Sequence, residues 1–268
     1  MSEADAVEQV DDPVTKSSIV SDLRDLGITG GETLLAHSSL RALGWVSGDA
    51  PAVVDALREA VTAAGTLVMP THTPQNSDPS VWSSPPVPDD WVETIRETRP
   101  PFRPDATPTR GMGAIPECFR TYPDVVRSDH PIYSFAAWGA DAEEIVAGHD
   151  LDYSLGEGSP LARVYERGGQ VLLLGTDHDT NTSLHLAEYR ADYPEETKRV
   201  SAPVLRDGER AEVEFEDLVI DSDDFGDLGA DFEREVGLTE GSVGAATAKL
   251  TEQRELVDFA VGWFEANR

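Results

Sequence analysis

The chain has 268 residues, of which 39% are hydrophobic and 27% charged, enough for the core of one large α/β domain or two modest ones. With 51 acidic side chains against 21 Lys and Arg, the formal net charge is −30, and such a surface repels nucleic acid and anionic lipid. No apolar run approaches the roughly 18 residues of a membrane span, and the first residues hold no apolar leader, so a cytoplasmic protein is predicted. The single cysteine, Cys118, excludes an internal disulfide.

The acid excess fits two explanations. Either it attracts a polycationic substrate, or it marks adaptation to very high salt, where the self-repulsion of the surface is screened. Because the excess extends far beyond any plausible site, we favour salt adaptation, under which the surface still permits a homodimer.

The N-terminal region is expected to hold a tail and then the start of the domain. Residues 1–14 predict a flexible acidic tail, and residues 15–268 a single domain. Thr15 is placed to cap a first helix that ends at Gly27.

A β–α–β unit is expected next. A buried strand over 33–36 precedes a helix over 50–63 and a second strand over 66–69. The loop after the first strand is therefore well placed for a ligand.

The segment between residues 70 and 108 holds ten of the 18 prolines, so a long ordered loop is expected over 72–108, with one short helix near 91–98. Six arginines lie between positions 96 and 127 of this acidic chain. They suggest a site for an anion such as phosphate, unless they only pair with nearby carboxylates.

Helices and strands continue to alternate in the rest of the chain. Helices are expected near 114–121, 142–147, 159–167, 182–190, 224–236 and 251–266, strands near 133–138 and 171–174, and in the final third a hairpin near 204–218 and a short strand pair.

The stretch that enters the helix near residue 182 is the most informative. His185 and Glu188 stand three residues apart, so both side chains emerge on one helical face. An imidazole beside a carboxylate, just after a strand, favours proton transfer. A histidine that only supports the core remains an alternative.

Metal binding is the other alternative, with His178, Asp177 or His72 as further ligands. No recognised ligand spacing occurs. A metal-dependent hydrolase would draw on the histidines at 37, 72, 178 and 185 together with Glu188.

Two loops are suited to approach a ligand closely. The segment His37–Leu40 offers small hydroxyl residues and backbone N–H groups, and His72 lies on the same side if the two strands are parallel. The Gly-rich turn Arg110–Gly113 opens a helix and lets the backbone approach a phosphate or a pantetheine chain.

Taken together, these stretches resemble the aminoglycoside N(3)-acetyltransferase family. The matching pieces follow the family's order across residues 15–266, and they are Leu34–Trp45, Gly65–Thr71, Thr107–Gly113, Arg127–Pro131, Ser134–Gly139 and Leu173–Glu188.

The resemblance implies a three-layer α/β/α fold with a mixed, largely parallel sheet and a smaller β-containing C-terminal part. It also implies acetyl-CoA as donor, the 3-amino group of a 2-deoxystreptamine antibiotic as acceptor, direct transfer, and no metal. Other small amines remain possible acceptors, and a binding protein without turnover remains a third class.

The resemblance also assigns roles to residues. His185 is the expected general base, with Glu188 or Asp177 orienting its imidazole. The expected acceptor side comprises His72, Asp179, Asn181 and the region 200–250. The expected contacts of acetyl-CoA are His37, Ser38, Ser39, Leu40, Thr71, Arg110, Gly111, Met112 and Gly113, with its phosphates toward the arginines.

Overall fold

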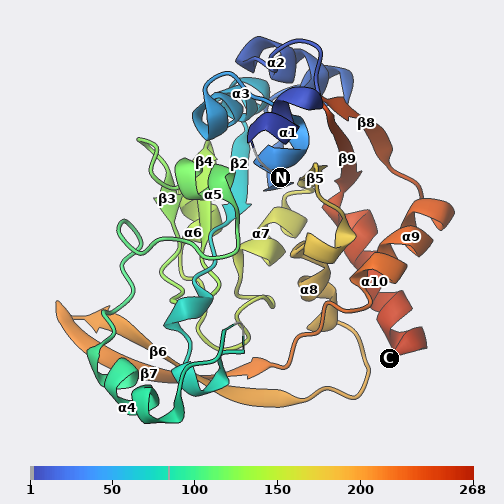
Figure 1. The fold of residues 1–268 in the computed structure, drawn as a ribbon. Coiled ribbons are helices and arrows are strands. Elements are labelled where there is room, and N and C mark those ends of the chain that lie inside the picture. The colour runs from blue at the N-terminus through green and yellow to red at the C-terminus, as the bar shows by residue number, and fades with distance from the viewer. Residues whose placement is uncertain (1–2, 84) are drawn as a thin grey trace.

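The structure, a computed structural model, describes residues 3–83 and 85–268, and it is built around one seven-stranded sheet (Figure 1). The strand order is β3-β4-β2-β1-β5-β9-β8. The strands are β1 (Thr33–Ser38), β2 (Thr66–Pro70), β3 (Val126–Arg127), β4 (Phe135–Gly139), β5 (Gln170–Leu174), β8 (Thr239–Val243) and β9 (Ala246–Glu252).

The sheet is mixed, as expected, but parallel pairing is confined to its centre. Strand β1 runs parallel to β2 and to β5, whereas β4, β3, β9 and β8 are all added antiparallel. The expectation of a largely parallel sheet was therefore too strong. The carboxyl ends of β1, β2 and β5 meet at one edge, which is where ligands bind in sheets of this kind.

The central strands are apolar on both faces, so helices cover both. On β1, Leu34 and Ala36 face one layer of helices and Leu35 faces the other. The first layer consists of α2 (Lys16–Asp25), α3 (Asp49–Val61) and α5 (Ala114–Phe119). The second consists of α6 (Ala142–Val146), α7 (Pro160–Glu166), α8 (Ser183–Glu188), α9 (Phe225–Glu235) and α10 (Gln253–Asn267). The three-layer fold is confirmed.

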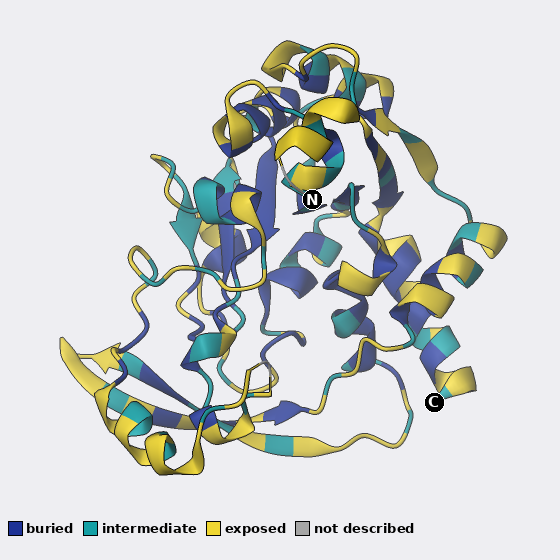
Figure 2. Cartoon of the chain, in the orientation of Figure 1, coloured by how far each residue is buried: buried dark blue, intermediate teal, exposed yellow. Residues whose placement is uncertain are grey.

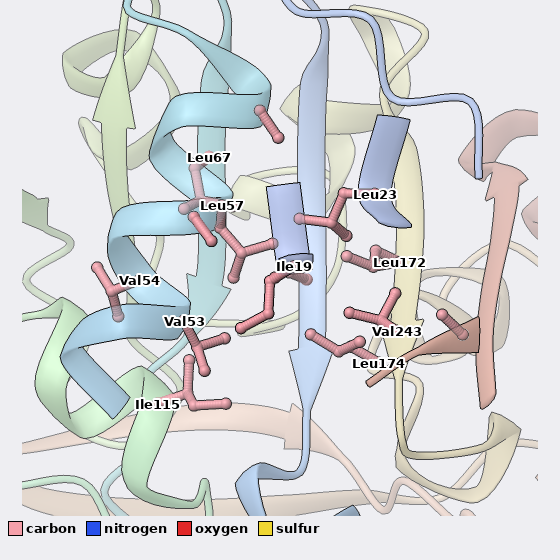
Figure 3. Close-up of a cluster of buried hydrophobic side chains, with 14 of the residues drawn as sticks. Ile19, Leu23, Val53, Val54, Leu57, Leu67, Ile115, Leu172, Leu174 and Val243 are labelled. Carbon is pink, nitrogen blue, oxygen red and sulfur yellow. The ribbon is translucent and has the colours of Figure 1, made fainter. Parts of the chain in front are cut away.

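Close packing in the first layer follows from helical spacing of apolar residues. Figure 3 shows Ile19 and Leu23 of α2, and Val53 and Leu57 of α3, over the strands beneath them. Thr15 caps α2 with its side chain, as the sequence predicts. Figure 2 shows the central strands as the most deeply buried part of the chain.

A long hairpin, β6 (Thr197–Arg206) and β7 (Glu209–Leu218), forms a separate two-stranded sheet at the bottom of Figure 1. It covers a small cluster in which Ile132 packs with Val213 and Phe215. This hairpin is the smaller β-containing part. Strands β8 and β9 instead join the main sheet, so the final third of the chain is divided between the two sheets.

The N-terminal segment differs from the loose tail expected for residues 1–14. Helix α1 (Glu3–Glu8) lies within it, and Val14 is buried and bridges to Val46. The apolar side chains of Val10 and Val14 pack on the core, which the acidic composition of the segment obscures.

The proline-rich loop contains helix α4 (Asp89–Thr98), close to the expected position. A partly buried guanidinium helps to hold the loop in place: Arg127 donates to the carbonyls of Thr71, Pro104 and Thr107. In the parts of the chain that the structure describes, no helix has the length and apolar character to cross a membrane.

Candidate active site

His185 and Glu188 form a hydrogen-bonded pair on α8, just beyond the carboxyl end of β5. At the start of this helix, the Asn181 side chain accepts the backbone N–H of Ser183 at 3.1 Å. His185 Nδ1 donates to Glu188 Oε2 at 2.5 Å. Since Nδ1 carries the hydrogen, Nε2 is the nitrogen that can accept a proton.

Burial distinguishes the two members of the pair. The side chain of His185 is 15% exposed, whereas that of Glu188 is 0% exposed. The second carboxylate oxygen, Glu188 Oε1, accepts the backbone N–H of Asp221 at 2.9 Å and Arg268 Nη1 at 2.6 Å. Sequence reasoning missed Arg268, because 80 residues separate it from Glu188.

Two further histidines lie close enough to His185 to influence one another electrostatically. Burial lowers the pKa of His37 to about 3, and it lowers the pKa of His72 well below the usual range; in both cases His185 adds to the effect. The His72 ring lies edge-on to Tyr133 and Phe135, with centroids 5.3 and 5.2 Å apart. His37 and His72 are therefore neutral. His37 lies near the carboxyl end of β1 and His72 just after the parallel strand β2.

A cavity of about 470 Å³ opens at the same edge of the sheet. Seven of the nine residues expected to bind acetyl-CoA line it: His37, Ser38, Ser39, Leu40, Gly111, Met112 and Gly113. The wall also includes residues to which the sequence analysis gave no individual role, although the stretches that resemble the family contain most of them: Arg41, Pro70, Ala114, Pro116, Thr176, Thr180 and Thr182.

The Gly-rich turn reaches the cavity because its backbone is held there. The Arg110 N–H donates to the His72 carbonyl at 3.0 Å. Gly111 and Gly113 have φ of +80° and +89°, a region in which residues with a Cβ are strained. A Cβ on Gly113 would also lie 3.7 Å from the Ser38 carbonyl oxygen, which shows how closely the two loops approach.

The remaining two expected cofactor residues do not line this cavity. The Thr71 hydroxyl is fully buried, donates to the Ser134 carbonyl at 3.1 Å and accepts Arg127 Nε at 3.1 Å, so it is engaged below the surface. The side chain of Arg110 is exposed beside the turn.

Asp177 does not contact His185, so the acid that orients the imidazole is Glu188. Asp177 instead pairs with Lys249 Nζ at 2.9 and 3.0 Å, and Lys249 also contacts Glu233 at 2.7 Å. Asp179 is exposed, while Asn181 is buried and its side chain accepts a backbone N–H at the start of α8.

Most of the arginine-rich segment is internally paired. Arg96 binds Asp78 and Glu93, Arg99 binds Glu212, Arg120 binds Glu117, and Arg127 binds carbonyls. Of the six, only Arg103 and Arg110 have no side-chain partner among the described residues, so most of the segment follows the alternative expectation of pairing with nearby groups.

The five residues named for a metal-dependent hydrolase do not form one ligand set. Within residues 3–83 and 85–268, the group with suitable ligand spacing is Asp177, His178 and Glu233. The ammonium of Lys249 contacts both of its carboxylates.

Comparisons with known proteins agree with this architecture. The sequence matches the family described as Aminoglycoside 3-N-acetyltransferase over residues 35–265. The SPbeta prophage-derived aminoglycoside N(3')-acetyltransferase-like protein YokD of Bacillus subtilis is 47% identical over 262 residues, covering 97% of this chain and 96% of that protein. The crystal structure of YokD gives a TM-score of 0.96 at 45% identity, over 98% of each chain.

The chain is also similar to solved structures of ligand-bound acetyltransferases. AAC-IIIb, binary with CoASH, gives a TM-score of 0.86 at 32% identity, covering 95% of this chain and 97% of that one. AAC-VIa bound to sisomicin gives 0.86 at 32% identity, covering 96% and 99%. With a family match over most of its length and relatives well above 30% identity, the chain belongs to the aminoglycoside 3-N-acetyltransferase family.

Proposed function

We propose that this protein transfers the acetyl group of acetyl-CoA directly to an amine, the 3-amino group of an aminoglycoside, with His185 as general base. The observation that carries the proposal is the His185–Glu188 pair beside a cavity lined by the His37–Ser39 loop and the Gly111–Gly113 turn.

The chemistry requires a base. An ammonium has no lone pair and cannot attack a thioester until it loses a proton. His185 Nε2 takes that proton, while Nδ1–H stays hydrogen-bonded to Glu188, whose charge stabilises the imidazolium. The amine nitrogen then forms a bond to the acetyl carbon as the carbon–sulfur bond breaks, and the imidazolium returns its proton to the departing thiolate.

The neutral state of His37 and His72 supports this role. Two charged imidazoles beside His185 would repel an ammonium substrate and oppose the formation of an imidazolium. Burial keeps both uncharged at neutral pH, so His185 is left to accept the proton.

The cavity wall offers hydrogen-bond donors for the thioester oxygen and the pantetheine chain. The buried hydroxyls of Ser38 and Thr176 have no partner among the described residues. A buried hydroxyl without a partner is costly, and a bound acyl-CoA would supply one. Ser38 replaces Thr71 as the candidate donor, because the Thr71 hydroxyl is engaged with the Ser134 carbonyl.

Another small amine is the second candidate acceptor. A cavity of about 550 Å³ lies between the hairpin and the proline-rich loop, beside Tyr133. Its wall carries Arg96, Lys198 and Arg199 against only Asp78 and Glu214, a balance that favours an acceptor less cationic than an aminoglycoside.

A thiol-release assay tests the proposed function. The protein is incubated with acetyl-CoA and either kanamycin, gentamicin or a panel of small primary amines, at several KCl concentrations. Acceptor-dependent release of CoA with an aminoglycoside supports the proposal. Release only with other amines supports the second candidate, and no release with any amine contradicts both.

We also infer that the acidic surface reflects salt adaptation of a cytoplasmic protein, which can form a homodimer when its charge is screened. The melting temperature is expected to rise between low and molar KCl, because screening reduces self-repulsion. A melting temperature independent of KCl contradicts the inference, and sedimentation at both salt concentrations reports the oligomeric state.

A further inference from the structure

The carboxylate of Glu188 is held from three sides. It is fully buried, and it accepts His185 Nδ1–H at 2.5 Å, the Asp221 backbone N–H at 2.9 Å and Arg268 Nη1 at 2.6 Å. A buried carboxylate is costly unless it is paired and hydrogen-bonded, so all three donors matter for its ionised state.

The guanidinium of Arg268 is itself immobilised. It follows α10, which packs along α8 (Figure 1). Its Nε and Nη2 donate to the two oxygens of Asp224 at 2.8 and 2.5 Å, and Nη2 also donates to the Asp221 carbonyl at 2.7 Å. The group stacks 4.0 Å from the centre of the Phe264 ring. A planar fork fixed in this way presents its remaining N–H to Glu188 in one geometry.

Burial opposes the charge of Arg268, but hydrogen bonds to Asp224 and Glu188 outweigh it and raise the pKa of the guanidinium. Arg268 is therefore a permanent cation. With Glu188 and Asp224 ionised and His185 neutral, the four side chains carry a net charge of −1. Proton uptake by His185 brings that charge to zero.

The other titratable groups that face this cluster are uncharged or acidic. His37 and His72 are neutral for the reason given above. Burial raises the pKa of Tyr133 and that of Tyr193 above the usual range, so both phenols keep their protons. Burial, Asp192 and Glu188 raise the pKa of Glu195. Among the described residues, Arg268 is the one permanent cation in contact with Glu188.

We propose that Arg268 is a positioning residue for the reaction: it keeps Glu188 ionised and aimed at His185, and it sets the pH range in which His185 is an uncharged base. The proposal rests on the proposed function. Without the guanidinium, the buried acids would hold an additional proton on the His185–Glu188 pair, and the free base would appear only at higher pH.

The first test is the pH dependence of kcat/KM for Arg268→Gln, with acetyl-CoA and an acceptor from the assay above. The acid limb is expected to move up by at least about one pH unit, which is about a fivefold loss of kcat/KM at the wild-type midpoint and approaches tenfold well below it, with recovery at alkaline pH. Arg268→Lys retains the charge and is expected to restore most of the wild-type limb. If kcat/KM of Arg268→Gln is lowered by the same factor at every pH, so that the midpoint of the acid limb does not move, the proposal is overturned.

A second variant predicts the opposite sign. Asp224→Asn removes one of the two acids that share the guanidinium, so more of its charge acts on Glu188. The acid limb is expected to move to lower pH. A shift in the same direction as Arg268→Gln would indicate that both changes act only by loosening the structure, and would overturn the proposal.

A readout without an acceptor separates this proposal from the proposed function. The ring C–H resonances of His185, assigned with His185→Gln, are followed against pH in wild type, Arg268→Gln and the matched surface variant Arg234→Gln. Arg234 is exposed and pairs only with acids on its own helix, Asp231 and Glu235. The titration midpoint is expected to move up in Arg268→Gln alone. If the midpoint shifts but the protein fails the acetylation assay, the proposed function is contradicted and the role of Arg268 is supported. If the enzyme is active but the midpoint does not shift, the role of Arg268 is contradicted and the proposed function is supported.

Discussion

Two clusters in this molecule use the same kinds of side chain and differ in what they can do. The His185 cluster comprises His185, Glu188, Asp224 and Arg268, and the His178 cluster comprises Asp177, His178, Glu233 and Lys249. In each cluster, a histidine from the segment after β5 contacts an acidic side chain, and one positively charged side chain from a distant element pairs with that acid.

The geometry separates them. In the His185 cluster the imidazole is partly exposed and its Nδ1 makes a 2.5 Å hydrogen bond to a buried carboxylate. In the His178 cluster the imidazole is buried, and its Nε2 lies 3.2 Å from Glu233 without forming a hydrogen bond, because Lys249 holds both acids. An oriented and accessible histidine can exchange protons with a substrate, whereas a buried one beside a structural ion pair stabilises the fold.

The largest effect that this comparison predicts is the loss of turnover on substitution of the histidine in the His185 cluster. His185→Gln is expected to lower kcat by at least ~10², the low end for the loss of a general base. His178→Gln is expected to leave kcat within about threefold, because the His178 imidazole is buried, whereas that of His185 is partly exposed. Steady-state kinetics on both variants measure this.

Equal losses in the two variants would show that the geometric distinction between the clusters has no functional meaning. Full activity in His185→Gln would remove the general base from the mechanism. Circular dichroism of both proteins serves as the folding control.

The second prediction concerns acid stability. Burial lowers the pKa of His178 despite Glu233 and Asp177, and it lowers the pKa of His149 to about 4 and that of His37 to about 3. The unfolded chain protonates these imidazoles near pH 6.5 while the folded chain does not. Stability is therefore fully present above about pH 6.5 and falls as the pH drops toward 4, by about 1.4 kcal/mol per pH unit for each such group.

Urea unfolding at pH 7.5, 6.5 and 5.5 checks the sign and the source of this effect. Wild type should lose stability in acid, and His178→Gln should lose less of it between pH 6.5 and 5.5. An unfolding midpoint that does not change over this range would contradict the neutral state of the buried histidines.

The smallest expected effect comes from the ion pairs of the His178 cluster. Lys249→Met should lower the free energy of unfolding by about 1 kcal/mol, since the Lys249 side chain is 12% exposed but Asp177 is 63% exposed. Turnover should stay within about threefold. If the same substitution reduced kcat a hundredfold at unchanged stability, the cluster would belong to the active site.

Much of this site was accessible from the sequence, because its parts are local. A helical spacing of three residues places His185 and Glu188 on one face, and the small residues of His37–Leu40 and Arg110–Gly113 mark loops that approach a ligand. The β–α–β order indicated that the loops after β1 and β2 would meet at one edge.

The errors have a common physical origin, namely partners that are distant in the chain. Asp177 is only eight residues from His185, yet Lys249 of β9 captures it. The arginines of the proline-rich loop looked like an anion site, but their carboxylate partners include Glu212 of the hairpin. The N-terminal segment was expected to be a flexible tail, but its apolar side chains pack against the core.

The sequence by itself determined the layers of helix and strand and the family, because these depend on short-range periodicity and on motifs in order. It also placed His185 and Glu188 on one helical face, but it left open whether Glu188 or Asp177 contacts the imidazole. Tertiary structure alone decided which ions pair, which histidines are held neutral and that Arg268 reaches Glu188. Those outcomes depend on burial and on distances of a few ångströms between segments far apart in the chain, which no spacing along the chain encodes.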